Sequence, residues 1–152
     1  MAIFYSFHYD NDNWRVQQIR NMGAIDNTGS IGAQEWESVR RNTSAAIKNW
    51  IDSQMSYKRA VVVLIGSQTA SRDWVKYEIQ RAWSLGKPLL GIKIHGLKDQ
   101  YGHTSIEGEN PFSSLGYWQV PVFTPQGWDS QQKYADIKNN LADWITRGYS
   151  RT

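Results

Sequence analysis

Hydrophobic residues in this chain fall into short runs that are typical of buried β-strands. The run Ala60 to Ile65 is wholly apolar, and Ile3 to Phe7 and Pro88 to Ile94 are nearly so. A continuous apolar run of this length indicates a strand covered on both faces, which is usual in parallel sheets. Val120 to Thr124 predicts a peripheral strand, and Ala24 to Ile25 predicts a weak one. The pattern therefore predicts five strands.

Between these runs, hydrophobic positions recur with the spacing of amphipathic helices. The predicted helices run from Asn13 to Gly23, Ser44 to Met55, Asp73 to Leu85 and Ser130 to Arg147, with a further helix starting in Trp36 to Arg41. Gly96 to Trp118 is rich in Gly and Pro and predicts a long loop. Alternating strands and helices predict an α/β fold, a three-layer sandwich with a mostly parallel five-stranded sheet. We expect residues 1–152 to form a single domain.

One acidic residue departs from this pattern. A helical wheel places Glu78 on the apolar arc of its helix, together with Trp74, Val75, Ile79, Ala82 and Leu85. An acid on an apolar face must find a partner, stay protonated or line a cavity that a ligand fills. A glutamate at the edge of a helix face often turns to solvent or pairs with an arginine, so the wheel alone leaves a structural role open. Trp74, one turn earlier, is equally well interpreted as a core residue.

The fold class predicts where a ligand would bind. In open parallel sheets, ligands bind beyond the carboxyl ends of the strands, at the point where the strand order reverses. The two loops expected there are the polar segment His8 to Asn13, after the first strand, and the turn Gly66 to Ser71. Glu78 lies near the start of the helix that follows this turn, which favours a functional role.

Composition narrows the choice of function. Of the 152 residues 40% are hydrophobic and 20% charged, with a net charge of +3 and no cluster of basic residues, so we expect no dedicated nucleic-acid surface. Cysteine is absent, and the three histidines lack ligand spacing, so we expect no metal site. Without a signal-peptide pattern or an apolar stretch of ~18 residues, we expect a cytoplasmic protein with no membrane contact. Phosphate-loop, dinucleotide, zinc-peptidase and hydrolase motifs are also absent.

Several segments resemble a known family. Asp73 to Ile79 resembles the catalytic-glutamate helix of TIR domains that cleave NAD, and Phe4 to Phe7 resembles their first strand. Phe4 to Asp10, Val63 to Thr69 and Arg72 to Ile79 more closely resemble the TIR-like ThsB family of the Thoeris antiphage defence system. Further agreement lies in Trp36-Glu37, Leu97 to Gly102, Asn110 to Phe112 and Leu115 to Tyr117. Ala24 to Gln34 lacks the usual TIR BB-loop pattern, and residues after Gly116 match poorly.

This resemblance implies a flavodoxin-like TIR fold and an enzyme that consumes NAD as a substrate, without a cofactor. Glu78 matches the catalytic glutamate, and Trp74 the tryptophan beside it. The other substrate-binding residues that we infer are Ser6, Phe7, His8, Asp10, Trp36 and Ser67. The expected product is a cyclic ADP-ribose-type signal that activates a separate effector protein. A phage protein as trigger and self-association into a homo-oligomer are further partners to consider.

Two other classes of function stay open. A non-enzymatic TIR-like module would assemble with other chains through an aromatic surface, for which Trp83, Trp118 and Trp128 are candidates because they lie off the predicted core faces. A flavodoxin-like protein that binds a nucleotide or flavin is the third interpretation.

Overall fold

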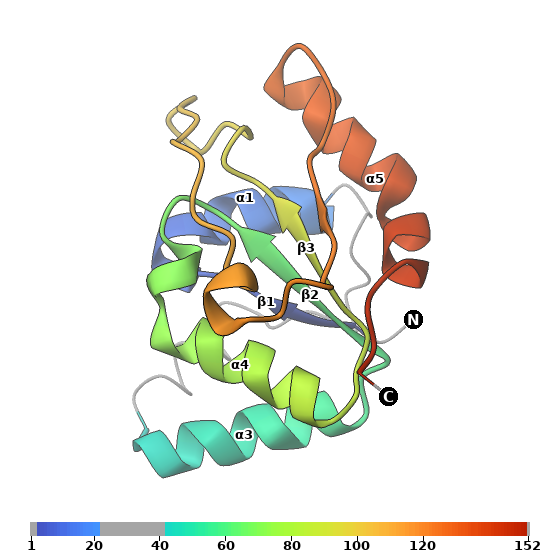
Figure 1. Ribbon diagram of the computed structural model, residues 1–152. Coiled ribbons are helices and arrows are strands. Elements are labelled where there is room, and N and C mark those ends of the chain that lie inside the picture. The colour runs from blue at the N-terminus through green and yellow to red at the C-terminus, as the bar shows by residue number, and fades with distance from the viewer. Residues whose placement is uncertain (1–2, 22–41, 152) are drawn as a thin grey trace.

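The structure, a computed structural model, describes residues 3–21 and 42–151. Four strands lie within these residues: β1 (Ile3–Ser6), β2 (Ala60–Ile65), β3 (Leu89–Lys93) and β4 (Val122–Phe123). They form a parallel sheet in the order β1-β2-β3-β4 (Figure 1). Ser6 is in register with Val63, so the carboxyl ends of β1 and β2 meet at the same edge of the sheet.

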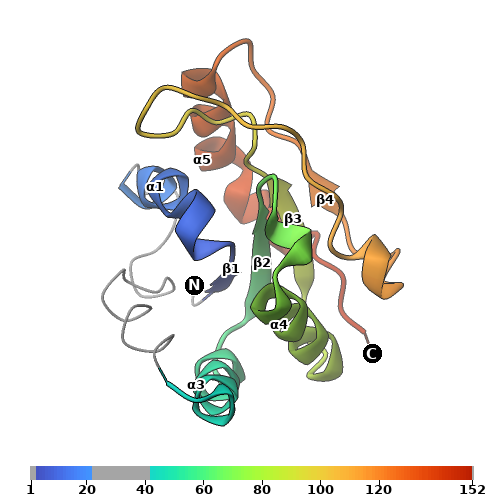
Figure 2. The same ribbon diagram turned by 90° about the vertical axis from the view of Figure 1, so that its left-hand side faces the viewer.

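Helices cover both faces of this sheet, which confirms the predicted α/β sandwich. Helices α1 (Tyr9–Asn21) and α5 (Ser130–Thr146) pack on one face, and α3 (Ser44–Ser56) and α4 (Asp73–Ser84) on the other (Figure 2). Strand β2 is buried along its whole length, as its continuous apolar run predicts. Its residues alternate between the two faces because successive side chains of a strand point to opposite sides.

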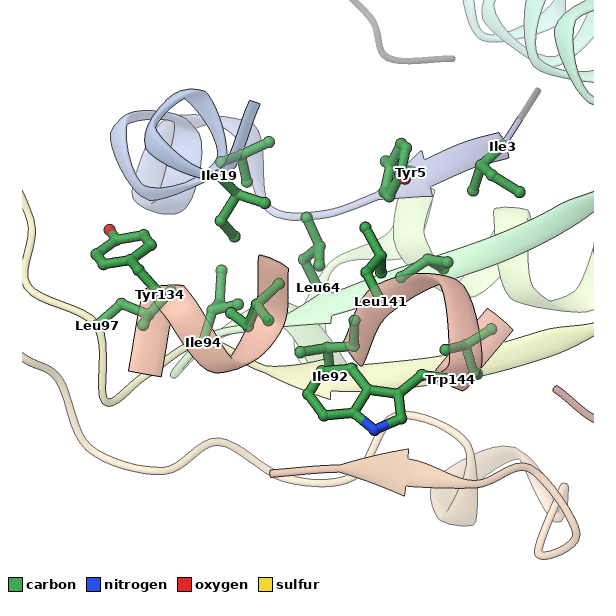
Figure 3. Close-up of a cluster of buried hydrophobic side chains, with 14 of the residues drawn as sticks. Ile3, Tyr5, Ile19, Leu64, Ile92, Ile94, Leu97, Tyr134, Leu141 and Trp144 are labelled. Carbon is green, nitrogen blue, oxygen red and sulfur yellow. The ribbon is translucent and has the colours of Figure 1, made fainter. Parts of the chain in front are cut away.

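Each face has its own hydrophobic core. Figure 3 shows the first, where Leu64 and Ile92 of the sheet meet Ile19 of α1 and Leu141 and Trp144 of α5. The second core joins the opposite face of the strands to α3 and α4 through Val61, Val63, Ile65, Ile51, Met55, Val75 and Ile79. Full burial of an aliphatic side chain contributes about 1.5–3 kcal/mol. The second core therefore fixes α4 against the strands that it crosses.

Two predicted elements fall on residues that the structure does not describe. The weak strand at Ala24 and Ile25 and the helix starting in Trp36 to Arg41 both lie outside the described ranges. Four of the five predicted strands are thus observed. The described strands follow chain order, so the reversal of strand order that we expected to mark the ligand site does not occur among them.

The predicted start of the first helix is wrong. The polar segment after the first strand is not a loop up to Asn13, because α1 already begins at Tyr9. Asp10 and Asp12 lie in its first turn, where carboxylates interact favourably with the helix dipole. The amide of Asp12 donates to the carbonyl of His8 at 2.9 Å. The polar residues near the sheet edge are therefore held on a helix.

Two predictions about side chains on α4 also need correction. Leu85, which the wheel assigned to the apolar arc, is 40% exposed because the helix ends at Ser84. Trp83, predicted to lie off the core, is partly buried and stacks on Tyr117 with ring centroids 4.0 Å apart. Tyr149 stacks on it as well, at 5.6 Å. Aromatic partners from distant segments thus cover Trp83, whereas Trp118 and Trp128 are exposed as predicted.

The first part of the long segment between β3 and β4 lies beyond the carboxyl ends of the strands, and its later part, with the short helix η2 (Ser113–Leu115), returns alongside the sheet (Figure 1). Asp99 organises its first part, since its Oδ1 accepts hydrogen bonds from the amides of Tyr101 and His103 at 2.9 and 3.0 Å. Gly108 packs against the backbone of Gly66 and Ser67 so closely that an added Cβ would overlap the Gly66 carbonyl. The loop therefore closes over the turn that follows β2.

No helix within residues 3–21 and 42–151 is long and apolar enough to cross a membrane.

Candidate active site

The acid on the apolar face of α4 has a partner on the sheet. Glu78 is 4% exposed, and its Oε1 accepts a hydrogen bond from the Ser6 hydroxyl at 2.7 Å. Ser6 comes two residues after Phe4, which packs in the core below α4. The two-residue period of a strand therefore points Ser6 toward the same helix. The only hydroxyl on β1 to face α4 thus meets the carboxyl group of Glu78.

Burial dominates the protonation of this carboxyl group. Removal from water raises the pKa of Glu78 to about 8, and the hydrogen bond from Ser6 opposes that rise in part. At pH 7 the carboxyl group is mostly protonated when the site is empty. A cationic ligand beside it would favour ionisation. Glu78 is therefore a neutral carboxyl group that a bound cation would convert to a carboxylate.

A cavity of about 190 Å³ opens beside this pair, at the carboxyl end of β1. Its walls combine aromatic, acidic and basic side chains. They come from the end of β1, the first turn of α1 and the start of α4: Phe7, His8, Tyr9, Asp10, Arg72, Trp74, Val75 and Glu78. A mixed apolar and polar lining with a few convergent charged groups is characteristic of small-molecule sites.

His8 is the second buried titratable group in the cavity wall. It is 8% exposed, and its Nδ1 has no hydrogen-bond partner among the described residues. Burial and the positive charge of Arg72 lower the pKa of His8, while the carboxylate of Asp10 opposes them. The imidazole is therefore neutral at pH 7 and presents a basic nitrogen.

A buried ion pair on α1 joins the site to the long loop. Asp12 is 0% and Arg15 3% exposed, and their Oδ1 and Nη1 atoms lie 3.1 Å apart. Arg15 also donates from Nε to the carbonyl of Leu97 at 2.8 Å and from Nη2 to that of His103 at 3.1 Å. The guanidinium thus connects α1, which carries Asp10 and begins directly after His8, to the loop beyond β3.

The same pair fixes the turn after β2. A Cβ added to Gly66 would overlap the Asp12 carboxylate, so only glycine allows this close approach. The Gly66 amide donates to the Thr69 hydroxyl at 2.8 Å, which orders the turn leading to α4. Burial raises the pKa of Asp12 to about 6, against the opposing effect of Arg15. Asp12 and Gly66 therefore lock α1 against the end of β2.

The structure brings together most of the residues proposed from the sequence. The cavity is lined by Phe7, His8, Asp10, Trp74 and Glu78. Ser6 donates a hydrogen bond to Glu78. Ser67 is not part of the lining, and Gly108 of the long loop packs against its backbone. Trp36 lies outside the described residues.

Sequence reasoning missed Arg72, which lines the cavity, and the Asp12–Arg15 pair that supports it. A cation directly before the helix with Glu78 was a usable signal for Arg72. The spacing of Asp12 and Arg15, one helical turn apart, also permits an ion pair, although their burial depends on the loop at Leu97. Within residues 3–21 and 42–151, no three His, Asp or Glu side chains are grouped to hold a metal ion.

Comparison with known proteins identifies the family of this chain. The family model described as "Thoeris protein ThsB, TIR-like domain" matches residues 4–99, which include Ser6, the first turn of α1 and Glu78. The chain belongs to the ThsB TIR-like family. The matched range contains every residue that lines the cavity, so the site lies wholly within the part of the chain that defines the family.

A curated relative comes from Bacillus cereus (strain MSX-D12), where it bears the name "Putative cyclic ADP-D-ribose synthase ThsB1". It is 38% identical to this chain over 120 residues, which make up 76% of this chain and 62% of the relative. The chain thus aligns with about three-fifths of the relative's length.

Replacing Ser6 with alanine should raise the pKa of Glu78 further, because the hydrogen bond that now lowers it is lost. The titration of the Glu78 carboxyl carbon, followed by NMR in selectively labelled protein, measures this directly. Ser67→Ala is the matched control, since no hydrogen bond joins Ser67 to Glu78 in the described structure. An unchanged or lower Glu78 pKa in Ser6→Ala would contradict the role given to the Ser6 hydroxyl.

Proposed function

We propose that this protein is an NAD-consuming enzyme of antiphage defence, which cleaves the bond between nicotinamide and ribose and makes a cyclic ADP-ribose-type signal. The observation that carries the proposal is the buried carboxyl group of Glu78, bonded to Ser6 and open to an aromatic-lined cavity. Membership of the ThsB family and the name of the relative support the same chemistry.

The reaction requires a carboxylate to stabilise positive charge, and it requires no general acid to protonate the leaving group. The nicotinamide of NAD is already cationic, so it leaves as a neutral molecule without protonation. The transition state at the ribose carbon has oxocarbenium character, as in glycoside cleavage. Glu78, ionised as the cationic substrate binds, would stabilise this charge, and its low-dielectric surroundings strengthen the interaction.

The cavity walls suggest how the substrate is held. Trp74 or Phe7 would stack on the nicotinamide ring, and Ser6 would keep the Glu78 carboxylate directed at the ribose. Arg72 supplies the positive charge that the diphosphate requires. The expected partners are NAD and a separate effector reached by the diffusible product. The protein would need no metal and no cofactor for this chemistry.

Mass spectrometry of purified protein incubated with NAD tests the proposal. The assay is run with protein alone and with lysate of phage-infected cells as a trigger, and lysate without the protein is the blank. We expect release of nicotinamide together with a product that has lost only nicotinamide from NAD. Linear ADP-ribose alone would contradict cyclisation, and no nicotinamide in either state would contradict NAD cleavage altogether.

Exposed aromatic side chains favour a second candidate, a non-enzymatic module that assembles with other chains. Trp118 is 77% and Trp128 98% exposed, and Tyr101 and Ile106 on the long loop are 75% and 80% exposed. Light scattering of the wild type and of the double variant Trp118→Ser, Trp128→Ser distinguishes this candidate. Self-association that depends on these residues but not on NAD or Glu78 would support it.

A further inference from the structure

Cleavage of the nicotinamide bond leaves one chemical task unassigned. When water or a hydroxyl group captures the ribose carbon, its oxygen forms the new bond and its O–H bond must break. The proton then needs an acceptor close to the reacting oxygen. Glu78 already stabilises the positive charge at the ribose carbon, so a second group in the cavity must accept the proton.

We propose that His8 is this proton acceptor. The proposal rests on the proposed function and extends it to the second half of the reaction. His8 lines the same cavity as Glu78, and its imidazole is more than nine-tenths buried. Its Nδ1 is a buried atom that no group in the described residues satisfies. Buried polar atoms are nearly always bonded, so such an atom at a site calls for a ligand.

The charges around His8 suit a base. Arg72 disfavours the imidazolium, and burial does so more strongly, so the ring begins the reaction neutral. Asp10 would stabilise the imidazolium once a proton arrives. Glu78 lines the same cavity and is the remaining titratable group of α4 there. His8 therefore has a ring nitrogen without a hydrogen-bond partner in the described residues, and the nearby carboxylate of Asp10 stabilises its charged form.

The bonds and electrons of the step balance. Nicotinamide leaves with the electron pair of the bond to ribose and becomes neutral. A lone pair of the attacking oxygen forms the new bond to the ribose carbon, and the O–H proton passes to Nδ1 of His8. The proton later leaves to solvent. The first half, bond cleavage, needs no base, whereas the second half does whenever the nucleophile carries a proton.

This difference provides the experiment. Labelled free nicotinamide can recapture the ribose intermediate and return to NAD, and its ring nitrogen has no proton to lose. In His8→Asn, exchange of label into NAD should stay within about threefold of the wild type, whereas formation of ADP-ribose, or of a cyclic product closed through a hydroxyl group, should fall by about 10²-fold or more. Both rates are measured in one reaction by chromatography, in the state of activation in which the wild type turns NAD over.

His95→Asn is the matched control. His95 likewise has a buried Nδ1 without a partner in the described structure and a pKa lowered by burial, but it does not line the cavity. It should keep both rates. Thermal unfolding of both variants checks that they fold, and His8→Gln provides a second substitution if His8→Asn does not.

The outcomes separate the two proposals. Loss of product formation with retained exchange supports His8 as the proton acceptor. If exchange and product formation fall together in folded His8 variants, His8 acts in binding or cleavage instead, and the assignment is overturned. If both rates persist, His8 has no part in the reaction. Absence of both reactions in the wild type would instead overturn the proposed function.

Discussion

Replacing Glu78 with glutamine should abolish nicotinamide release while leaving a folded protein. The amide keeps the shape of the carboxyl group and can still accept the hydrogen bond from Ser6, but it cannot become negative opposite the oxocarbenium ion. We expect turnover of NAD to fall by at least about 10²-fold, with exchange of free nicotinamide into NAD lost to the same extent. Glu107→Gln is the control, because Glu107 is exposed and paired with Lys93 away from the cavity lining.

The same variant should change how stability depends on pH. Folding raises the pKa of Glu78 from 4.5 to about 8, so the folded state binds this proton more tightly than the unfolded state. The contribution of Glu78 to stability is therefore full below pH 4.5 and is lost as the pH rises through about 8. Glu78→Gln removes this loss, and we expect it to be more stable than the wild type at pH 8 by more than about 1 kcal/mol.

Urea unfolding at pH 5 and pH 8 measures this difference in the wild type, Glu78→Gln and Glu107→Gln. Glu107→Gln should retain the loss of stability at high pH, because Glu78 is intact. Activity that survives in Glu78→Gln would remove Glu78 from the reaction. A stability gain at pH 5 as large as that at pH 8 would contradict the raised pKa.

The second large effect is expected on stability, from replacing Arg15 with methionine. Methionine retains the apolar stem of the side chain but removes the charge opposite Asp12 and the donors to the carbonyls of Leu97 and His103. Breaking a buried ion pair by removing one partner costs about 3–5 kcal/mol, because the remaining charge stays out of water. We expect a loss of this size in the free energy of unfolding at pH 8.

Protonation of Asp12 should relieve part of that loss at low pH. Arg15 lowers the pKa of Asp12, so its removal raises that pKa above about 6. The neutral acid no longer needs a cation, and the destabilisation relative to the wild type should be smaller at pH 5 than at pH 8. Urea midpoints at the two pH values test both the size and the direction of the effect.

Arg147→Met is the matched control for this prediction. Arg147 also pairs with an aspartate, Asp143, but at 3.7 Å and with both side chains at least 60% exposed. An exposed pair contributes about 0–1 kcal/mol, so this variant should unfold almost like the wild type. Equal losses in the two variants would show that burial of the Asp12–Arg15 pair does not determine its contribution.

Much of the fold followed from hydrophobic periodicity. The apolar run at β2 predicted a central strand, and the spacing of Tyr134, Ile137, Leu141 and Trp144 predicted α5 almost to its ends. Both signals are strong because every position that is buried, on one face of the helix or along the whole strand, must carry an apolar residue. The start of α1 was harder to predict, because its first turn is polar and is stabilised by charges at the helix end.

The site divides in the same way. The position of Glu78 on an apolar face was legible in the sequence, and the structure places it at 4% exposure beside Phe7, His8, Asp10 and Trp74. The hydrogen bond to Ser6 joins residues 72 positions apart, so no local pattern could reveal it. Ser67 was expected at the site from its place in the turn after β2, yet it does not line the cavity, and its backbone packs against Gly108 of the long loop.

The sequence by itself determined the order of most elements and the family, and it indicated the acid that departs from the apolar pattern, because local spacing encodes which residues must avoid water. Only the tertiary structure decided what that acid touches, how strongly burial holds its proton, and that an unsatisfied histidine shares its cavity. These properties arise from groups brought together across the sheet edge, where the ends of β1 and β2 meet. Desolvation there depends on all surrounding segments at once, which no single stretch of sequence specifies.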